Sequence, residues 1–243
     1  MTRLLRLVLT SLLLLGLSSA CTTYAPTVAQ GLELYDEGDY TKAFQTLDKL
    51  AREGNTQAQQ VLGVMYENGQ GVKKDERQAI VWFRQAADAN NASAQYLLGS
   101  ILERQAAGSE TPIETLKWYR LAATNGHPSA QYRMGQLELK ATKGGAAPDL
   151  LKASYWFGLA AVQGDPQAQL QYGLLIMQGR TGRADRVLGY MWVDIAQGLG
   201  DNATIQDAIV AARSLSSTEL QSAKKMSTQC IKQNYQSCSR LPR

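Results

Sequence analysis

Two residue types recur along this chain at a nearly constant distance, which restricts the fold to a stack of similar units. The tryptophans are Trp82, Trp118, Trp156 and Trp192, at intervals of 36, 38 and 36 residues. A glycine series, Gly63, Gly99, Gly135 and Gly173, has intervals of 36, 36 and 38 residues. One two-residue insertion, placed in the Gly- and Pro-containing stretch 140–149, satisfies both series. A repeat length between about 20 and 50 residues is the signature of solenoids and related arrays.

Within one repeat the apolar residues follow helical spacing. In the unit beginning near residue 56 they occupy two stripes with the spacing i, i+3, i+4, i+7 and i+8, which predicts two helices. The stripes are Ala58, Val61, Leu62, Met65 and Tyr66, then Ala79, Trp82, Phe83, Ala86 and Ala87. Gly69 and Gly71 break the first helix, and Asp75 is an expected N-terminal cap for the second. Since one helix pair cannot bury both faces alone, the pattern predicts an all-α solenoid of stacked helix-turn-helix units.

The repeated glycines and tryptophans are the expected repeat core. Glycine inside a helix costs about 1 kcal/mol relative to alanine. We therefore expect the four glycines to make room for a neighbouring helix or for a tryptophan ring. The tryptophans have two interpretations, packing inside the array or stacking on a ligand, and their common helical position favours packing.

The unit at 56–91 closely resembles the Sel-one-like repeat, a relative of the tetratricopeptide repeat. The resemblance is carried by Ala58-Gln59, Leu62-Gly63, Tyr66, Gly69-x-Gly71, Asp75, Ala79, Trp82 and Ala86-Ala87. The later units keep the Ala-Gln start, the glycine and the tryptophan but lose parts of the middle loop. Residues 28–55 are shorter and read more like a tetratricopeptide unit. The resemblance implies a superhelical fold whose surfaces hold protein partners.

These patterns divide the chain into a leader, a tether, an array and a cap. The last segment contains a predicted capping box from Ser216 to Glu219, which opens a final helix through about Thr228. The expected segments are a signal peptide at 1–20, a lipid-anchored tether at 21–27, five repeats at about 28–55, 56–91, 92–126, 127–164 and 165–200, and a C-terminal helical cap and tail at 201–243.

The first twenty residues have the layout of a secretory signal. Arg3 and Arg6 precede an apolar run of eleven residues, 7–17, and small residues precede Cys21. The stretch 17–21 resembles a bacterial lipobox, in which the cysteine is lipidated, although Ser18 stands where that family usually has leucine. Ordinary cleavage after Ala20 is the alternative. Because Thr22 rather than aspartate follows the cysteine, the resemblance implies delivery to the periplasmic face of the outer membrane.

The chain has three cysteines, Cys21, Cys230 and Cys238. An odd count in an exported protein leaves one thiol to explain. If Cys21 carries lipid, the other two can form one disulfide in an oxidising compartment, and two free thiols are the alternative.

The side chains needed for catalysis or for a metal site are scarce. The one histidine, His127, lies in a turn between two units, and we interpret it as a surface turn residue. No zinc-ligand set or phosphate-binding loop is present in the sequence, so no catalytic residue, metal or cofactor is expected. Without residues 1–20 the chain has 23 basic and 21 acidic side chains, a net charge of +2, which argues against nucleic-acid binding.

These observations favour a non-enzymatic scaffold that helps to assemble an envelope complex, with partners that are envelope proteins and a membrane reached through Cys21. A second hypothesis is binding of peptidoglycan or another glycan by Tyr96, Tyr119 and Tyr132. A third is β-lactam binding or hydrolysis, because some cysteine-rich relatives of the repeat are linked to that activity. Only Cys230 and Cys238 have the cysteine spacing of those relatives, which disfavours the third hypothesis.

Overall fold

The computed structural model describes residues 26–106, 111–140, 147–180, 182, 184–197, 202–235 and 238, with the backbone alone for 202–205 and 208. Over these residues the chain contains twelve α-helices and no strand, so the predicted all-α solenoid is confirmed. The helices are α1 Val28–Asp36, α2 Tyr40–Arg52, α3 Thr56–Asn68, α4 Glu76–Asp88, α5 Ala92–Gln105, α6 Ile113–Thr124, α7 Pro128–Leu139, α8 Leu150–Ala161, α9 Pro166–Met177, α10 Arg186–Gln197, α11 Asn202–Ala212 and α12 Ser217–Lys232.

Polar caps and glycine turns set the helix ends. Asp75 caps α4 by accepting hydrogen bonds from the backbone N–H groups of Arg77 and Gln78, as predicted. Gly69 ends α3 in the left-handed conformation, with φ of 74°, which glycine adopts without a steric penalty. The Ser216–Glu219 capping box is present at the start of α12, but the helix continues beyond Thr228 to Lys232.

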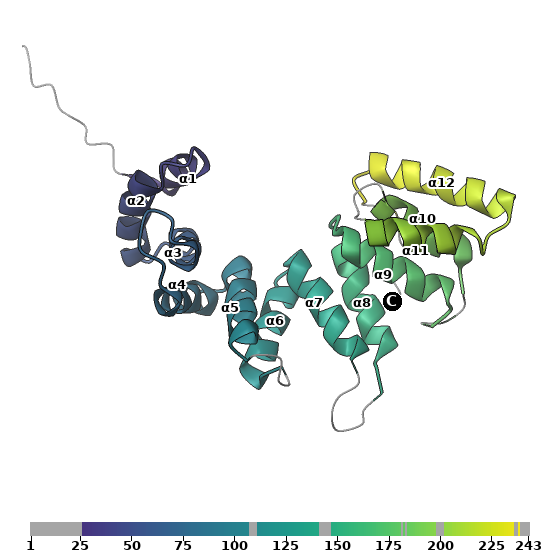
Figure 1. The fold of residues 1–243 in the computed structure, drawn as a ribbon, viewed down its shortest axis with the longest axis horizontal. Helices are drawn as coiled ribbons and strands as arrows, with labels where there is room; N and C mark the ends of the chain where they lie inside the picture. The colour runs from purple at the N-terminus through teal and green to yellow at the C-terminus, as the bar shows by residue number, and fades with distance from the viewer. Residues whose placement is uncertain are drawn as a thin grey trace, which may run out of the picture.

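The helices pack mainly on their neighbours along the chain. The most extensive packing joins α3 to α4, α5 to α6, α7 to α8 and α9 to α10, and α1 pairs with α2 in the same order along the chain. Figure 1 shows these pairs following one another along an open curve, with α1 and α3 on its inner side and α2 and α4 outside. Such local contacts make the array quasi-one-dimensional, so each pair depends on the next for burial of its apolar faces.

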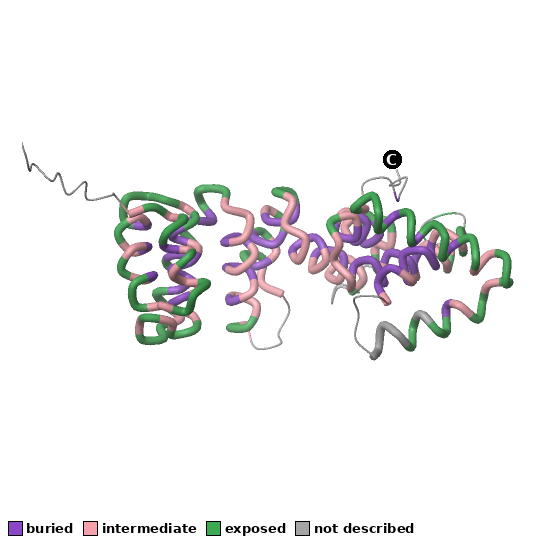
Figure 2. The backbone as a smooth tube through the Cα atoms, turned by 90° about the horizontal axis from the view of Figure 1, so that it is seen from above, coloured by how far each residue is buried: buried purple, intermediate pink, exposed green. Residues whose placement is uncertain are grey.

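The core is correspondingly divided into five successive clusters rather than gathered in one centre. Figure 2 shows buried positions recurring along the whole array. At the C-terminal end α12 packs on α10, and Leu220 and Ala223 of α12 join the cluster that contains Tyr190 and Val193. The last helix thus covers apolar surface that a following repeat would otherwise bury.

Candidate functional site

The four repeated glycines make room for the residue that follows each tryptophan. A Cβ atom on Gly99 would lie 2.8 Å from Cδ1 of Tyr119, and one on Gly135 would lie 2.6 Å from Cε1 of Phe157. Gly63 faces Phe83 in the same way, whereas Gly173 lies against the backbone of Gly189 and the side chain of Val193. The expectation of a neighbouring helix is therefore correct. The alternative of a tryptophan ring is wrong, because the only tryptophan atom among the nearest neighbours of the four glycines is Cβ of Trp192, beside Gly173.

The tryptophans themselves lie mostly inside the array. Trp82, Trp118 and Trp192 are buried, and Trp156 is half-buried with its ring centroid 5.2 Å from that of Tyr155. The Trp118 indole N–H donates to the Glu114 carboxylate over 3.4 Å. Three of the four rings are thus closed to a stacking ligand, which leaves Trp156 as the one with partly open surface.

A ladder of buried glutamines joins successive repeats, and the sequence interpretation missed it. Each glutamine amide donates to the last-turn carbonyl of the preceding unit over 3.1 Å. The pairs are Gln59 with Ala51, Gln95 with Ala87, Gln131 with Ala123, and Gln169 with Ala161. The Ala-Gln dipeptide that begins each unit was the available signal.

Two of the ladder glutamines, Gln95 and Gln131, also accept a hydrogen bond through their side-chain oxygen. Gln95 accepts from Asn125 over 2.9 Å, and Gln131 accepts from Gln163 over 2.7 Å. A satisfied buried hydrogen bond contributes about 1 kcal/mol, and leaving a partner unpaired costs more. These bonds fix how one unit sits on the next, which makes the surface of the array preorganised for a partner.

His127 lies in the turn between α6 and α7, as expected from the sequence, and it is also the N-terminal cap of α7. It is half-buried, and its Nδ1 accepts a hydrogen bond from the Ala130 backbone N–H over 3.4 Å. Asn55, Asn91 and Asp165 cap α3, α5 and α9 at the same repeat position. The His127 ring also stacks on Tyr96 with centroids 4.6 Å apart, and burial lowers the pKa of its imidazole. These contacts give His127 a role in folding.

Charged and polar side chains connect the first helices of neighbouring repeats. We call this the first-helix face, formed by Glu67, Glu103, Arg104, Arg133 and Gln136 of α3, α5 and α7. Arg104 pairs with Glu67 over 2.7 Å, and Arg133 pairs with Glu103, whose carboxylate also accepts from the Tyr119 hydroxyl over 2.8 Å. Arg133 donates further to Gln136 over 2.8 Å.

The electrostatics of the first-helix face fit a structural and binding role. Burial alone would raise the pKa of Glu103, but the hydrogen bonds from Arg133 and Tyr119 hold that pKa below its usual value. Burial and the Glu103 carboxylate raise the pKa of Tyr119 far above its ordinary value, so the phenol stays protonated. These groups therefore hold one another in fixed charge states.

The tyrosines expected to stack on a glycan are only partly available. Tyr119 is 2% exposed and fills the space beside Gly99, so its ring cannot reach a ligand. Tyr96 and Tyr132 are half-buried, and Tyr96 is already stacked on His127.

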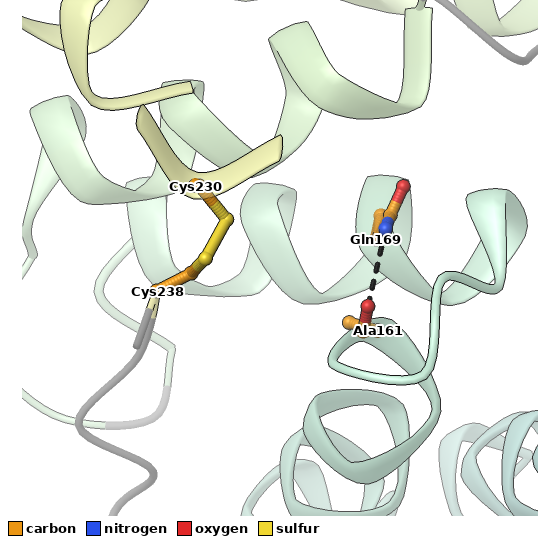
Figure 3. Close-up of a disulfide and its surroundings, with 4 residues drawn as sticks. All are labelled: Ala161, Gln169, Cys230 and Cys238. Carbon is orange, nitrogen blue, oxygen red and sulfur yellow. Dashed lines mark hydrogen bonds between the residues drawn. A yellow bond between two sulfur atoms is a disulfide. The ribbon is translucent and has the colours of Figure 1, made fainter. Parts of the chain in front are cut away.

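The structure joins Cys230 and Cys238 by a disulfide with Cα atoms 5.1 Å apart (Figure 3). Close to this bridge, Tyr235 packs on the turn between α8 and α9, which contains Gly164 and ends the fourth unit. A Cβ atom on Gly164 would lie 3.2 Å from Cε2 of Tyr235. Both cysteines and Tyr235 belong to the cluster that contains Phe157 and Trp192.

Two further sequence predictions fall on other parts of the chain. The signal peptide at 1–20 and the lipidation residue Cys21 lie outside the described residues.

None of the described helices combines the length and hydropathy that a bilayer crossing requires. Across the described ranges, histidines, cysteines and carboxylates form no group of three or more that could hold a metal ion.

The same units are found by comparison with known protein families. The family model described as Sel1 repeat matches residues 56–91, 92–127, 128–165 and 166–196, which together are more than half of the chain. The chain belongs to the Sel1 repeat family. None of the curated proteins matches it. The matches to the family model begin at residue 56, after α1 and α2. Residues 28–55 also differ from the later units in their sequence pattern.

Solved structures of other Sel1 repeat proteins resemble the chain. A Sel1 repeat protein from Oxalobacter formigenes is 28% identical, with a TM-score of 0.63 over 74% of this chain and 57% of that one. The chain thus spans little more than half of that protein's length. A putative Sel1 repeat protein from Klebsiella pneumoniae is 21% identical, with a TM-score of 0.46 over 76% of this chain and 91% of that one. The protective antigen c5321 of uropathogenic Escherichia coli is 23% identical, with a TM-score of 0.43 over 89% of this chain and 64% of that one.

Membership in the Sel1 repeat family accounts for the contacts described above. The glycine–aromatic pairs, the glutamine ladder and the caps recur unit by unit, and all of them serve to build the array. Sel1 repeats are typical of protein–protein interaction scaffolds and generally are not catalytic, so the surfaces of the array are the candidate functional site.

Proposed function

We propose that this Sel1 repeat protein is a non-catalytic scaffold that binds envelope proteins at the periplasmic face of the outer membrane, held there by a lipid on Cys21. The observation that carries the proposal is the array itself, whose units are locked to one another by the glutamine ladder. A preorganised array loses little conformational freedom when a partner binds, which favours affinity.

The location rests on the leader and on the cysteines. Residues 1–20 have the order of a secretory signal, and Cys21 follows small residues as a lipobox cysteine does. The disulfide between Cys230 and Cys238 suits an oxidising compartment such as the bacterial periplasm.

Fractionation of Cys21→Ser tests the anchor. We expect the full-length tagged protein to sediment with outer membranes and Cys21→Ser to appear in the soluble periplasm. Cys238→Ser is the matched control, because it also removes one thiol but leaves the lipidation residue in place, so it should stay with the membrane. Continued sedimentation of Cys21→Ser with the outer membrane would contradict the anchor.

Crosslinking in intact cells tests the scaffold. Tagged full-length protein should capture the components of one envelope complex, identified by mass spectrometry, and the Cys21→Ser variant should lose them. Capture of nothing above an untagged background would contradict the scaffold function.

A further inference from the structure

The outer sides of α8 and α10 carry equivalent apolar stripes. Leu151, Tyr155 and Leu159 are spaced i, i+4 and i+8 along α8. The positions 36 residues later on α10 are Val187, Met191 and Ile195. The tryptophan register, Trp156 to Trp192, fixes this equivalence, so the two stripes occupy the same place in successive repeats.

The stripe on α10 is covered by a helix of the same chain. Met191 is 1% exposed and Ile195 is 2% exposed, and both share a cluster with the disulfide cysteines at the end of α12. Val187 shares another cluster with Leu220 and Ala223 of α12. Figure 1 shows α12 lying along this side of α10.

The stripe on α8 has no such cover. Leu151 is 65% exposed and Tyr155 is 47% exposed, and α8 packs extensively only on α7 and α9 among the described helices. Ile113, at the position of Leu151 one repeat earlier, is 87% exposed. Exposed apolar residues that are contiguous on a surface are a feature of protein interaction sites.

The charges beside this stripe are mainly basic. We call the surface of Ile113, Lys117, Leu151, Tyr155 and Leu159 the second-helix face. Lys117 and Arg120 of α6 have no ion pair among the described residues, and the Lys117 ammonium lies 5.0 Å from the centroid of the Trp118 ring.

The nearby acidic groups do not balance this positive charge. Asp149 is paired with Lys152 over 3.0 Å, and Glu114 is paired with Arg84 over 2.8 Å. The Glu138 carboxylate also attracts the Lys152 ammonium, and the Arg120 guanidinium repels that ammonium. With these pairs formed, the unpaired groups among the described residues here are Lys117, Arg120 and the carboxylate of Glu138, so the face keeps one positive charge in excess.

We propose that the second-helix face binds an amphipathic α-helix of a partner protein, with an apolar stripe flanked by aspartate or glutamate. Within this chain, α12 already packs as a helix across the equivalent stripe of α10. Apolar residues spaced i and i+4 are also the pattern by which an amphipathic helix is bound in a groove. The unpaired lysine and arginine select an acidic flank. The C-terminal helices of a second copy fit poorly, because they carry exposed Arg213, Lys224 and Lys225 and would bring like charges together.

This inference rests on the proposed function and identifies the chemistry of one partner. It can be tested with a photo-crosslinking amino acid at Tyr155 of the full-length protein in intact cells, followed by mapping of the crosslinked peptide. Val81 is the matched position on α4, at the same place in its repeat, and Ser100 samples the first-helix face. We expect adducts at Tyr155, but not at Val81, with one peptide that forms an acidic amphipathic helix.

Surface substitutions give an independent check. Leu151→Glu places a carboxylate in the apolar stripe, and truncating or charging a central contact typically weakens binding by roughly tenfold or more. Val210→Glu is the control, since Val210 on α11 is 64% exposed and lies elsewhere. We expect Leu151→Glu to reduce the Tyr155 adduct at least tenfold, Val210→Glu to leave it unchanged, and both variants to keep the parent melting temperature.

Each other outcome overturns the inference in a distinguishable way. Adducts at Ser100 without any at Tyr155 would reject the helix site but leave the scaffold function standing. Adducts at Tyr155 with a second copy, with lipid, or with a peptide lacking the acidic amphipathic pattern would also reject the helix site. Absence of adducts at all three positions would reject both the site and the scaffold.

Discussion

The ring of Phe157 occupies the space into which any side chain on Gly135 would project. A Cβ atom on Gly135 would lie 2.6 Å from Cε1 and 2.7 Å from Cδ1 of that ring. Gly135 belongs to α7 and Phe157 to α8, so the contact sets how closely the two helices of one repeat approach. The array therefore depends on a glycine in the middle of a helix, where propensity alone disfavours it.

Gly135→Ala should lower the free energy of unfolding by about 1–3 kcal/mol, because overpacking outweighs the gain in helix propensity. Urea unfolding of a soluble form that begins after Cys21 measures this. Ser129→Ala is the control, because Ser129 lies in the same helix, is half-buried and makes no side-chain hydrogen bond within the described residues, and it should change stability little. The double variant with Phe157→Leu should cost less than the sum of the single changes, and strict additivity would contradict the proposed steric contact.

Gln131→Leu should destabilise the chain by about 1–3 kcal/mol, since it removes the bond from Gln131 to the Ala123 carbonyl, which keeps only the Gly126 N–H, and takes away the acceptor of the Gln163 amide. The same change at exposed Gln57 should have little effect. Because Gln131 accepts from Gln163 over 2.7 Å, a double-mutant cycle of these two residues should reveal coupling. A loss no larger for Gln131 than for Gln57 would show that the ladder does not stabilise the stacking.

His127→Asn should remove a pH dependence of stability. Burial lowers the pKa of His127 in the folded chain, so as pH falls through its unfolded pKa of about 6.5 the unfolded chain takes up more protons and stability declines. Asparagine caps α3 and α5 at this position and does not titrate, so the variant should keep the cap and show a flatter profile. Unfolding at pH 8 and pH 5.5, with NMR titration of the one imidazole, provides the measurement, and an imidazole pKa at or above the unfolded value would refute it.

Cys238→Ser should lower stability by about 2 kcal/mol, at the low end for disulfides because the closed loop is short. The loss should be local, since the bridge holds Tyr235 against Gly164. Faster proteolysis near Lys232, with the rest of the array intact, is the expected pattern. A reducing agent should reproduce the effect in the parent protein and have no effect on the variant. Equal cleavage rates with and without reductant would count against a stabilising bridge.

Residues whose role is complete within one turn of helix were the ones whose structural place could be predicted. Asp75 and the Ser216–Glu219 box were recognised as caps because their chemistry is local and is complete within one turn of helix. The capping role of His127 was missed because an imidazole is an unusual cap, and this role is evident only beside Asn55, Asn91 and Asp165 at the same place. The glutamine ladder was missed because each bond joins the start of one unit to the end of the unit before it.

The sequence by itself determined the period, the helical pairs and hence the solenoid, because apolar spacing and helix-breaking glycines act over a few residues. Only the tertiary structure decided which side chain fills the space beside each repeated glycine, since Phe83, Tyr119 and Phe157 belong to the other helix of the same repeat. It likewise decided that the apolar stripe of α10 is covered while the equivalent stripe of α8 is open. Both stripes have the same local pattern, and their burial depends on whether a helix distant in sequence packs across them.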